Sequence, residues 1–262
     1  MNAPETPLPL ADEVDVADET ENTPGSSLSS TVPSGSVRPR RIDWVDGVEG
    51  PCRVDSLRAR VAKRVIDLVF VVAFGVVAVP AIAVAAALIH LASPGPVFYS
   101  QVRIGRGGRR FLLWKLRTML PDAERRLEEF LEGDPKLRAE WESGHKLEED
   151  PRIIPKIGEL LRRTSVDELP QLWNVLRGEM TLVGPRPLPE YHLAKFDEWF
   201  RRYRQRVTPG VTGLWQVESR DDGRPEMFVH WDCQYIRNWS LGKDLRILMK
   251  TIVVVLGRRG AC

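Results

Sequence analysis

The stretch that decides how this chain is built covers residues 68–89 and reads LVFVVAFGVVAVPAIAVAAALI. It holds 22 residues without a formal charge, and Pro80 stands near its centre. A straight helix of that length, rising about 1.5 Å per residue, reaches roughly 33 Å, enough for a hydrocarbon core of about 30 Å. The sequence therefore predicts a helix that works at a membrane.

Basic clusters flank this apolar run on both sides. They comprise Arg58, Arg60, Lys63 and Arg64 before it, and Arg103, Arg106, Arg109, Arg110, Lys115 and Arg117 after it. A spanning helix would put one cluster on the translocated side, against the positive-inside bias. A re-entrant helix that breaks at Pro80 and leaves by the same face keeps both clusters in the cytoplasm, and proline favours a break because it lacks a backbone donor. An ordinary kinked transmembrane helix is the equal alternative.

The remaining sequence divides into an acidic tail and one domain. Residues 1–36 contain seven acids and no Lys or Arg, and they are rich in Pro, Ser and Thr. Such a composition predicts a disordered cytoplasmic tail, here bounded at residues 1–55, and its start does not read as a signal peptide. Residues 56–92 then hold the juxtamembrane and membrane helix. Residues 93–262 leave room for a single domain.

Cysteines and histidines indicate no disulfide framework or zinc site. The chain has three widely spaced cysteines without a C-x-x-C pair, which is typical of a reducing compartment. Its four histidines form no ligand spacing, so we expect them to be structural or exposed. There is no P-loop and no dinucleotide-binding glycine fingerprint, and we expect no nucleic-acid partner.

Beyond residue 92 the pattern predicts mostly α structure with short β elements. Residues 93–96 (SPGP) are a turn that stops the membrane helix. We expect an extended piece at 97–99, a tight turn at 105–108, an amphipathic strand or helix at 111–114, and helices over 121–142, 190–206 and 245–256. Gly133 and Pro135 are expected to divide the first of these helices. The last one is too short to span, so it packs in the core or lies flat on the bilayer as an interfacial amphipathic helix.

The chemistry concentrates where residues 162–174 read RRTSVDELPQLWN. Ser165 and Glu168 have the spacing of a capping box, and Pro170 suits a first helical turn. On that interpretation Asp167 and Glu168 have only a structural role at a helix N-terminus. The functional alternative uses the same geometry, because a helix start keeps a carboxylate ionised and an ionised Asp beside a divalent metal and arginines can attack a phosphoryl group.

Basic residues around this segment suit a phosphate ligand. Arg162, Arg163 and Arg186 would make bidentate contacts to diphosphate oxygens, and the rigid GPRP stretch at 184–187 holds Arg186 at low entropic cost. Lys115 and Arg117 alternate with bulky apolar residues. This pattern suits contact with anionic lipid or phosphate, with an ordinary amphipathic strand or helix as the equal alternative.

Several of these stretches together resemble a known family. They are the proline-containing apolar helix and the segments 93–96, 115–119, 150–153, 161–175, 178–187, 209–217 and 238–240. In this order, from Lys63 to Cys262, the chain resembles the bacterial polyprenyl-phosphate sugar-phosphate transferases, the monotopic phosphoglycosyl transferases.

That resemblance implies a mechanism. Asp167 would attack the β-phosphate of a UDP-hexose, release UMP and carry the phosphosugar, which undecaprenyl phosphate then accepts to start an exopolysaccharide or O-antigen glycan. Asp167 would also be a ligand of Mg²⁺, and Glu168 would assist, as the base for the acceptor. Arg162 and Arg186 would hold phosphate, and Lys115 and Arg117 would complete the substrate-binding set.

The resemblance also implies a re-entrant helix in the bacterial inner membrane, with the catalytic domain on the cytoplasmic face. The insertion at 121–150 favours galactose or glucose as the sugar, and a homo-oligomer is left open. Val166, Thr181 and Glu218 depart from the family pattern, and we expect Glu218 to alter sugar or nucleotide contacts. Two alternatives remain: a membrane-surface scaffold with a degenerate site, and a polytopic transferase without a covalent intermediate, although the several spanning helices of the latter are missing.

Overall fold

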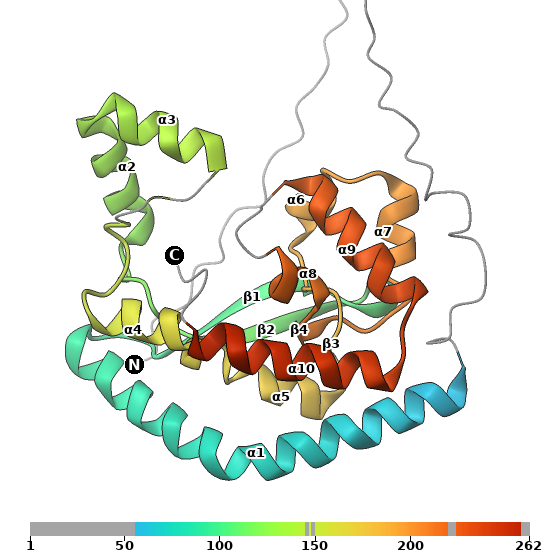
Figure 1. Cartoon of the computed structure of the whole chain (residues 1–262). Helices are drawn as coiled ribbons and strands as arrows, with labels where there is room; N and C mark the ends of the chain where they lie inside the picture. Colours follow the sequence, from blue (N-terminus) through green and yellow to red (C-terminus); the bar gives the residue numbers. More distant parts are fainter. Residues whose placement is uncertain (1–55, 145–146, 148–149, 220–223, 258–262) are drawn as a thin grey trace, which may run out of the picture. The chain divides into compact units, whose positions relative to one another are not determined.

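The computed structural model describes residues 56–144, 147, 150–219 and 224–257, so the acidic tail lies outside the described residues. The α-helices are α1 (Leu57–Ala92), α2 (Ala123–Gly133), α3 (Pro135–Gly144), α4 (Ile157–Thr164), α5 (Gln171–Arg177), α6 (Glu190–Leu193), α7 (Glu198–Arg204), α8 (Leu214–Glu218), α9 (Pro225–Arg237) and α10 (Leu241–Leu256). The strands are β1 (Phe98–Ile104), β2 (Arg110–Leu116), β3 (Thr181–Val183) and β4 (Gly210–Thr212), with 3-10 turns η2 (Arg106–Gly108) and η3 (Val166–Glu168). The fold is mostly helical with short strands, as the sequence predicts (Figure 1).

Helix α1 is long and apolar enough to cross a membrane, by its length and composition. The side chain of Ser56 begins it by accepting a hydrogen bond from the Ala59 N–H at 3.2 Å. The predicted break at Pro80 is not found, because residues 57–92 form one continuous helix with the proline inside it. A proline removes only one N–H donor from the ladder, so the helix bends, as Figure 1 shows, without being interrupted.

One stripe of α1 packs on the rest of the domain between Asp67 and Ile89. The buried residues on this stripe are Asp67, Val71, Ala78, Ala85 and Ile89. Their spacings of four and seven residues put them on one face of a helix. The opposite face leaves large apolar side chains exposed, among them Val69, Val72, Val76 and Val79. Helix α1 therefore lies along the domain with an apolar outer surface.

Polar contacts fix both ends of α1 to the same domain. Near the start, Lys63 pairs with Asp244 of α10 at 2.5 Å. At the far end, the guanidinium of Arg117, just after β2, donates to the carbonyl oxygens of Ser93 and Pro94. Both termini of the helix consequently face one globular unit.

Strands β1 and β2 form an antiparallel hairpin whose register runs from Phe98 opposite Leu116 to Ile104 opposite Arg110. The segment 111–114, for which strand and helix were both open, is thus a strand. The turn is possible because Gly107 and Gly108 adopt positive φ values of 66° and 76°. The hairpin supplies a two-sided platform, with one face on the core.

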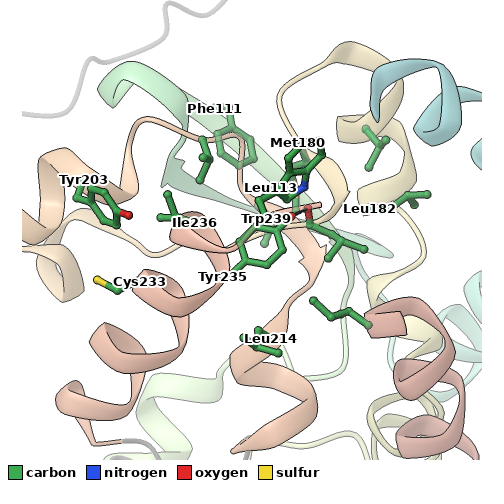
Figure 2. Packing of buried hydrophobic residues seen from close by; sticks show 14 of the residues in the cluster. Phe111, Leu113, Met180, Leu182, Tyr203, Leu214, Cys233, Tyr235, Ile236 and Trp239 are labelled. Atoms are coloured by element: carbon green, nitrogen blue, oxygen red, sulfur yellow. Dashed lines mark hydrogen bonds between the residues drawn. The ribbon is translucent and has the colours of Figure 1, made fainter. Parts of the chain in front are cut away.

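Residues from β2, β3, α9 and the chain between α9 and α10 meet in the main core (Figure 2). The buried members drawn there include Phe111, Leu113, Met180, Leu182, Tyr235, Ile236 and Trp239. Strands β3 and β4 pair in parallel beside this core, and their backbones approach so closely that a Cβ on Gly210 would lie 2.1 Å from the Gly184 nitrogen. This contact fixes the start of the GPRP loop.

Two helix predictions have different outcomes. The 121–142 segment divides into α2 and α3 between Gly133 and Pro135, as expected. The single helix expected over 190–206 is wrong, since it is two helices, α6 and α7, separated by residues 194–197. Phe196 lies in that interruption with its ring 5.1 Å from that of Phe200 and 6.3 Å from that of Phe228. The free energy gained by burying this aromatic side chain exceeds what a continuous helix over these residues would contribute.

Candidate functional site

Asp167 lies on η3, in the short connection between α4 and α5. The expected capping box is not formed, because Ser165 adopts a left-handed φ of 55° and its side chain caps neither helix. Its backbone N–H instead bonds to the carbonyls of Leu161 and Arg162 and so ends α4. An N-cap needs an extended backbone, which a left-handed residue lacks. Pro170 stands immediately before α5 rather than inside its first turn.

The Asp167 carboxylate is buried and unbonded. Only 8% of this residue is exposed, and within the described ranges no N–H or O–H group donates to its carboxylate. Burial, and then the charge of Glu168, raise the pKa of Asp167 to about 6, while Lys115, Arg162 and Arg186 oppose the rise. Asp167 is therefore a basic carboxylate, largely ionised at neutral pH, with its lone pairs free for another atom.

Glu168 is bonded where Asp167 is not. The Lys115 ammonium on β2 lies 2.6 Å from its carboxylate, and the Arg186 guanidinium lies 3.5 Å from the same oxygen. All three side chains are partly buried, with 18–33% exposed. The structure thus brings together three residues that are 53 and 18 positions apart in the sequence. Glu168 holds the two cations at the edge of the Asp167 site.

Arg162 and Arg117, which were also predicted to bind the substrate, have different hydrogen-bond partners in the structure. Arg162 on α4 donates from Nε to the Thr118 hydroxyl at 3.0 Å, and burial lowers its pKa while Asp167 and Asp150 oppose the change. Arg117 is only 8% exposed, and it uses its Nη groups on the end of α1. Both line the cavity above Asp167, but the guanidinium of Arg117 is already hydrogen-bonded to the C-terminal end of α1.

A cavity of about 960 Å³ opens over Asp167. Its walls include all the predicted site residues except Pro80 and Arg163. They also include residues that the sequence did not assign to the site: Tyr99, Gln101, Arg103, Arg152 and the start of α2 from Asp122 to Arg125. Tyr99, Gln101 and Arg103 alternate on β1, so a two-residue period beside Lys115 is the signal that would have found them. Burial, then Arg186, lowers the pKa of Arg103 to about 10.

The described residues offer no group of three or more His, Cys, Asp or Glu that could hold a metal ion by itself. Mg²⁺ is usually bound through one or two carboxylates, with substrate phosphates and waters completing its coordination. A free Asp167 carboxylate facing a cavity large enough for a diphosphate fits that chemistry. Glu218 lies elsewhere: it pairs with Lys250 at 2.6 Å and is not part of the cavity wall.

Three relatives share this sequence over most of its length. A UDP-galactose-lipid carrier transferase of Erwinia amylovora is 45% identical over 207 residues, which are 78% of this chain and 42% of that protein. An undecaprenyl-phosphate galactose phosphotransferase of Salmonella typhimurium is 46% identical over 167 residues, or 64% of this chain and 35% of that protein. The exopolysaccharide production protein ExoY of Sinorhizobium fredii is 39% identical over 201 residues, 77% of this chain and 88% of that protein.

The chain therefore spans less than half of the first two relatives and most of the third. The family model described as bacterial sugar transferase matches residues 58–258, from the start of α1 to just beyond α10. That range contains Asp167 and the whole cavity around it. The chain belongs to the bacterial sugar transferase family.

Proposed function

We propose that this protein transfers a hexose 1-phosphate from a UDP-hexose to undecaprenyl phosphate, with Asp167 as the nucleophile. The observation that carries the proposal is the state of Asp167: a buried carboxylate without a hydrogen-bond donor among the described residues, at the wall of a cavity rich in Arg and Lys. A structural carboxylate in such surroundings would be bonded to its neighbours. The names of the relatives point to the same substrates.

In the first step, an Asp167 carboxylate oxygen attacks the β-phosphorus of the UDP-hexose. A bond forms between that oxygen and phosphorus, and the bond to the oxygen bridging the two phosphates breaks. The electron pair leaves with UMP, so the phosphosugar stays on Asp167 as an acyl-phosphate. With its pKa near 6, Asp167 is ionised at neutral pH yet more basic than an ordinary carboxylate.

Cations around the cavity stabilise the charge that develops on the phosphates. Arg162 and Arg186 present planar guanidinium groups that match phosphate oxygens, and Lys115 adds a point charge. Glu168 keeps Lys115 and Arg186 in position before the substrate arrives, through its contacts of 2.6 and 3.5 Å. Preorganised charges in a partly dry site act most strongly on the transition state.

In the second step, a phosphate oxygen of undecaprenyl phosphate attacks the phosphorus of the phosphosugar. The new bond gives a lipid-linked diphosphate sugar, and the electron pair of the broken acyl-phosphate bond returns to Asp167. Undecaprenyl phosphate is an anion at neutral pH, so Glu168 acts here by holding cations and by taking up any remaining proton. Galactose and glucose are the proposed sugars.

Mg²⁺ is the proposed metal. Bound to the substrate diphosphate, it would neutralise charge on the phosphate oxygens. Asp167 would hold it, since its carboxylate is unoccupied by protein donors, whereas Glu168 is already paired with Lys115 and Arg186.

Helix α1 is proposed to be re-entrant, with the domain on the cytoplasmic face of the bacterial inner membrane. The support is that both its ends, and the buried stripe between them, contact one globular unit. A spanning helix would draw those contacts into the bilayer. Membrane-impermeant labelling of single cysteines placed at Ser56 and Ser93 tests this, because labelling from opposite sides of the membrane would exclude a re-entrant helix.

The transfer reaction is tested with the full chain in membranes that contain undecaprenyl phosphate and Mg²⁺. A panel of UDP-sugars is added, and UMP is measured together with the lipid-linked sugar. We expect UMP release in a ratio of one to each lipid-linked sugar, with UDP-galactose or UDP-glucose as the best donor. Release of UDP instead of UMP, or no release from any donor, would contradict the proposal and favour a non-catalytic scaffold.

A further inference from the structure

A second basic cavity, of about 210 Å³, lies at the opposite end of α1 from Asp167. Its wall consists of Arg60, Lys63, Arg64 and Asp67 from α1, Arg106 from η2, Arg206, Val207 and Thr208 from the chain after α7, and Gly178, Met180, Thr181 and Tyr235. None of these residues lines the Asp167 cavity, whose wall begins beyond the C-terminal end of α1 at Pro96. The two cavities are therefore separate sites.

The carboxylates near this cavity already accept hydrogen bonds from the protein. Asp67 accepts hydrogen bonds from the Thr181 hydroxyl at 2.5 Å and the Leu182 N–H at 3.1 Å. Lys63 is paired with Asp244, which also accepts from the Tyr235 hydroxyl at 2.8 Å. Among the described residues, no ion pair joins a carboxylate to Arg60, Arg64 or Arg106, so the cavity keeps an excess of positive charge.

Two of the wall arginines are available to a ligand. Within the described part of the chain, Arg60 and Arg106 form no ion pair, and the buried Nε of Arg60 has no hydrogen-bond partner. Arg64, by contrast, is fixed by donating to the carbonyl oxygens of Val175 and Leu176. A buried donor without a partner is costly, and an anion that accepted its hydrogen bond would remove that cost.

An exposed apolar surface borders the cavity. Leu57, Val61 and Val65 are 70%, 53% and 54% exposed. Leu57 lies three residues before Arg60, and Val61 lies three residues before Arg64, so each pair is adjacent on the helix surface. A ligand that carries both a phosphate and hydrocarbon chains would satisfy the arginines and cover this surface together. A free phosphate ion would leave the apolar side chains exposed.

We propose that this cavity binds the phosphate group of an anionic membrane phospholipid, whose acyl chains lie along Leu57, Val61 and Val65. The lipid would hold the first turns of α1 at the headgroup level, next to the salt bridge from Lys63 to Asp244. The site rests on the proposed location at a membrane, but it uses no residue of the Asp167 cavity. Its failure would accordingly leave the proposed transfer reaction intact.

The test measures binding of fluorescent phosphatidylglycerol to the full chain in mixed detergent micelles. The variant Arg60→Gln/Arg106→Gln is compared with Arg58→Gln/Arg109→Gln, which removes two charges from the same segments at exposed positions outside the cavity. We expect the first variant to bind about 25-fold more weakly, because each lipid-facing cation contributes about fivefold. The control should bind within about twofold of the unchanged protein. Thermal unfolding verifies that both variants fold, and Arg106→Gln alone, on an exposed turn, serves if the double variant does not.

Competition identifies the ligand. Unlabelled phosphatidylglycerol is expected to displace the fluorescent lipid, whereas phosphatidylcholine and millimolar inorganic phosphate are not. Displacement by inorganic phosphate would overturn the lipid assignment in favour of a soluble anion. Equal losses in the two double variants would overturn the site itself, since they would show only general attraction between basic residues and an acidic micelle.

Discussion

The two basic cavities at the ends of α1 contain similar residues but treat their carboxylates differently. At one end, Asp167 has no hydrogen-bond donor among the described residues, and its pKa is raised to about 6. At the other end, Asp67 accepts two hydrogen bonds, and Asp244 accepts from Lys63, Tyr235 and Trp239. A carboxylate whose lone pairs are engaged is a structural group. We expect the bonding of the oxygens, more than the surrounding composition, to separate a reactive aspartate from a structural one.

Replacing the unbonded carboxylate has the largest expected effect. Asp167→Asn removes the nucleophile, so we expect UMP release to fall by about 10³-fold or more. The folded protein should be as stable as before or more stable, because burial penalises the Asp167 charge and the amide has none. UMP release and the thermal unfolding midpoint are measured on the same preparation. Full activity, or a collapse of stability, would place Asp167 among the structural carboxylates.

The corresponding substitution near the second cavity is Asp244→Asn, in the carboxylate that accepts from Lys63, Tyr235 and Trp239. It leaves Lys63, whose side chain is 13% exposed, without its charged partner and weakens the bonds from Tyr235 and Trp239. Breaking a buried pair in this way costs about 3 kcal/mol of unfolding free energy. Denaturant unfolding measures this loss, and UMP release per folded molecule should change far less than in Asp167→Asn. An unchanged stability would erase the contrast between the two cavities.

The pH dependence of the transfer reaction is expected to show a smaller effect, and it tests the pKa of Asp167 directly. Asp167 attacks as the carboxylate, so activity should be lost as the pH falls through its pKa of about 6, well above the usual value of 3.8. Lys115 lowers that pKa, and Lys115→Met should therefore move the acidic limb to higher pH. The measurement is the pH profile of UMP release at saturating donor. A limb near pH 4 in both proteins would mean that another step controls the rate.

Much of this arrangement follows from short-range sequence pattern. The apolar run predicts α1, and the glycine and proline at 133 and 135 predict the division between α2 and α3. The RRTSVDELP stretch contains Asp167, the proposed nucleophile. These features depend on neighbouring residues, whose preferences act directly on the backbone.

The sequence did not predict three features, and two of them, at Arg117 and Arg103, depend on contacts between distant segments. Ser165 matches a capping box, yet it adopts a left-handed conformation that ends α4 and turns the chain toward Asp167. Arg117 matches a phosphate ligand, yet the carbonyls of Ser93 and Pro94 lie within its reach. Arg103 was not assigned to the site, because its partner Pro187 lies in a loop 84 positions away. Local periodicity carries no information on such partners.

The smallest expected effect belongs to a carboxylate that lies outside both cavities. Glu218 departs from the family pattern, and the sequence predicts that it alters sugar or nucleotide contacts. In the structure it pairs instead with Lys250, and the two side chains are 29% and 49% exposed. Such a surface pair contributes at most about 1 kcal/mol. Glu218→Gln should hence change UMP release by less than about twofold for every donor, as measured across the UDP-sugar panel. A change in donor preference would mean that Glu218 itself affects binding of the donor. Lys250→Gln, which removes the same pair, should then leave that preference unchanged.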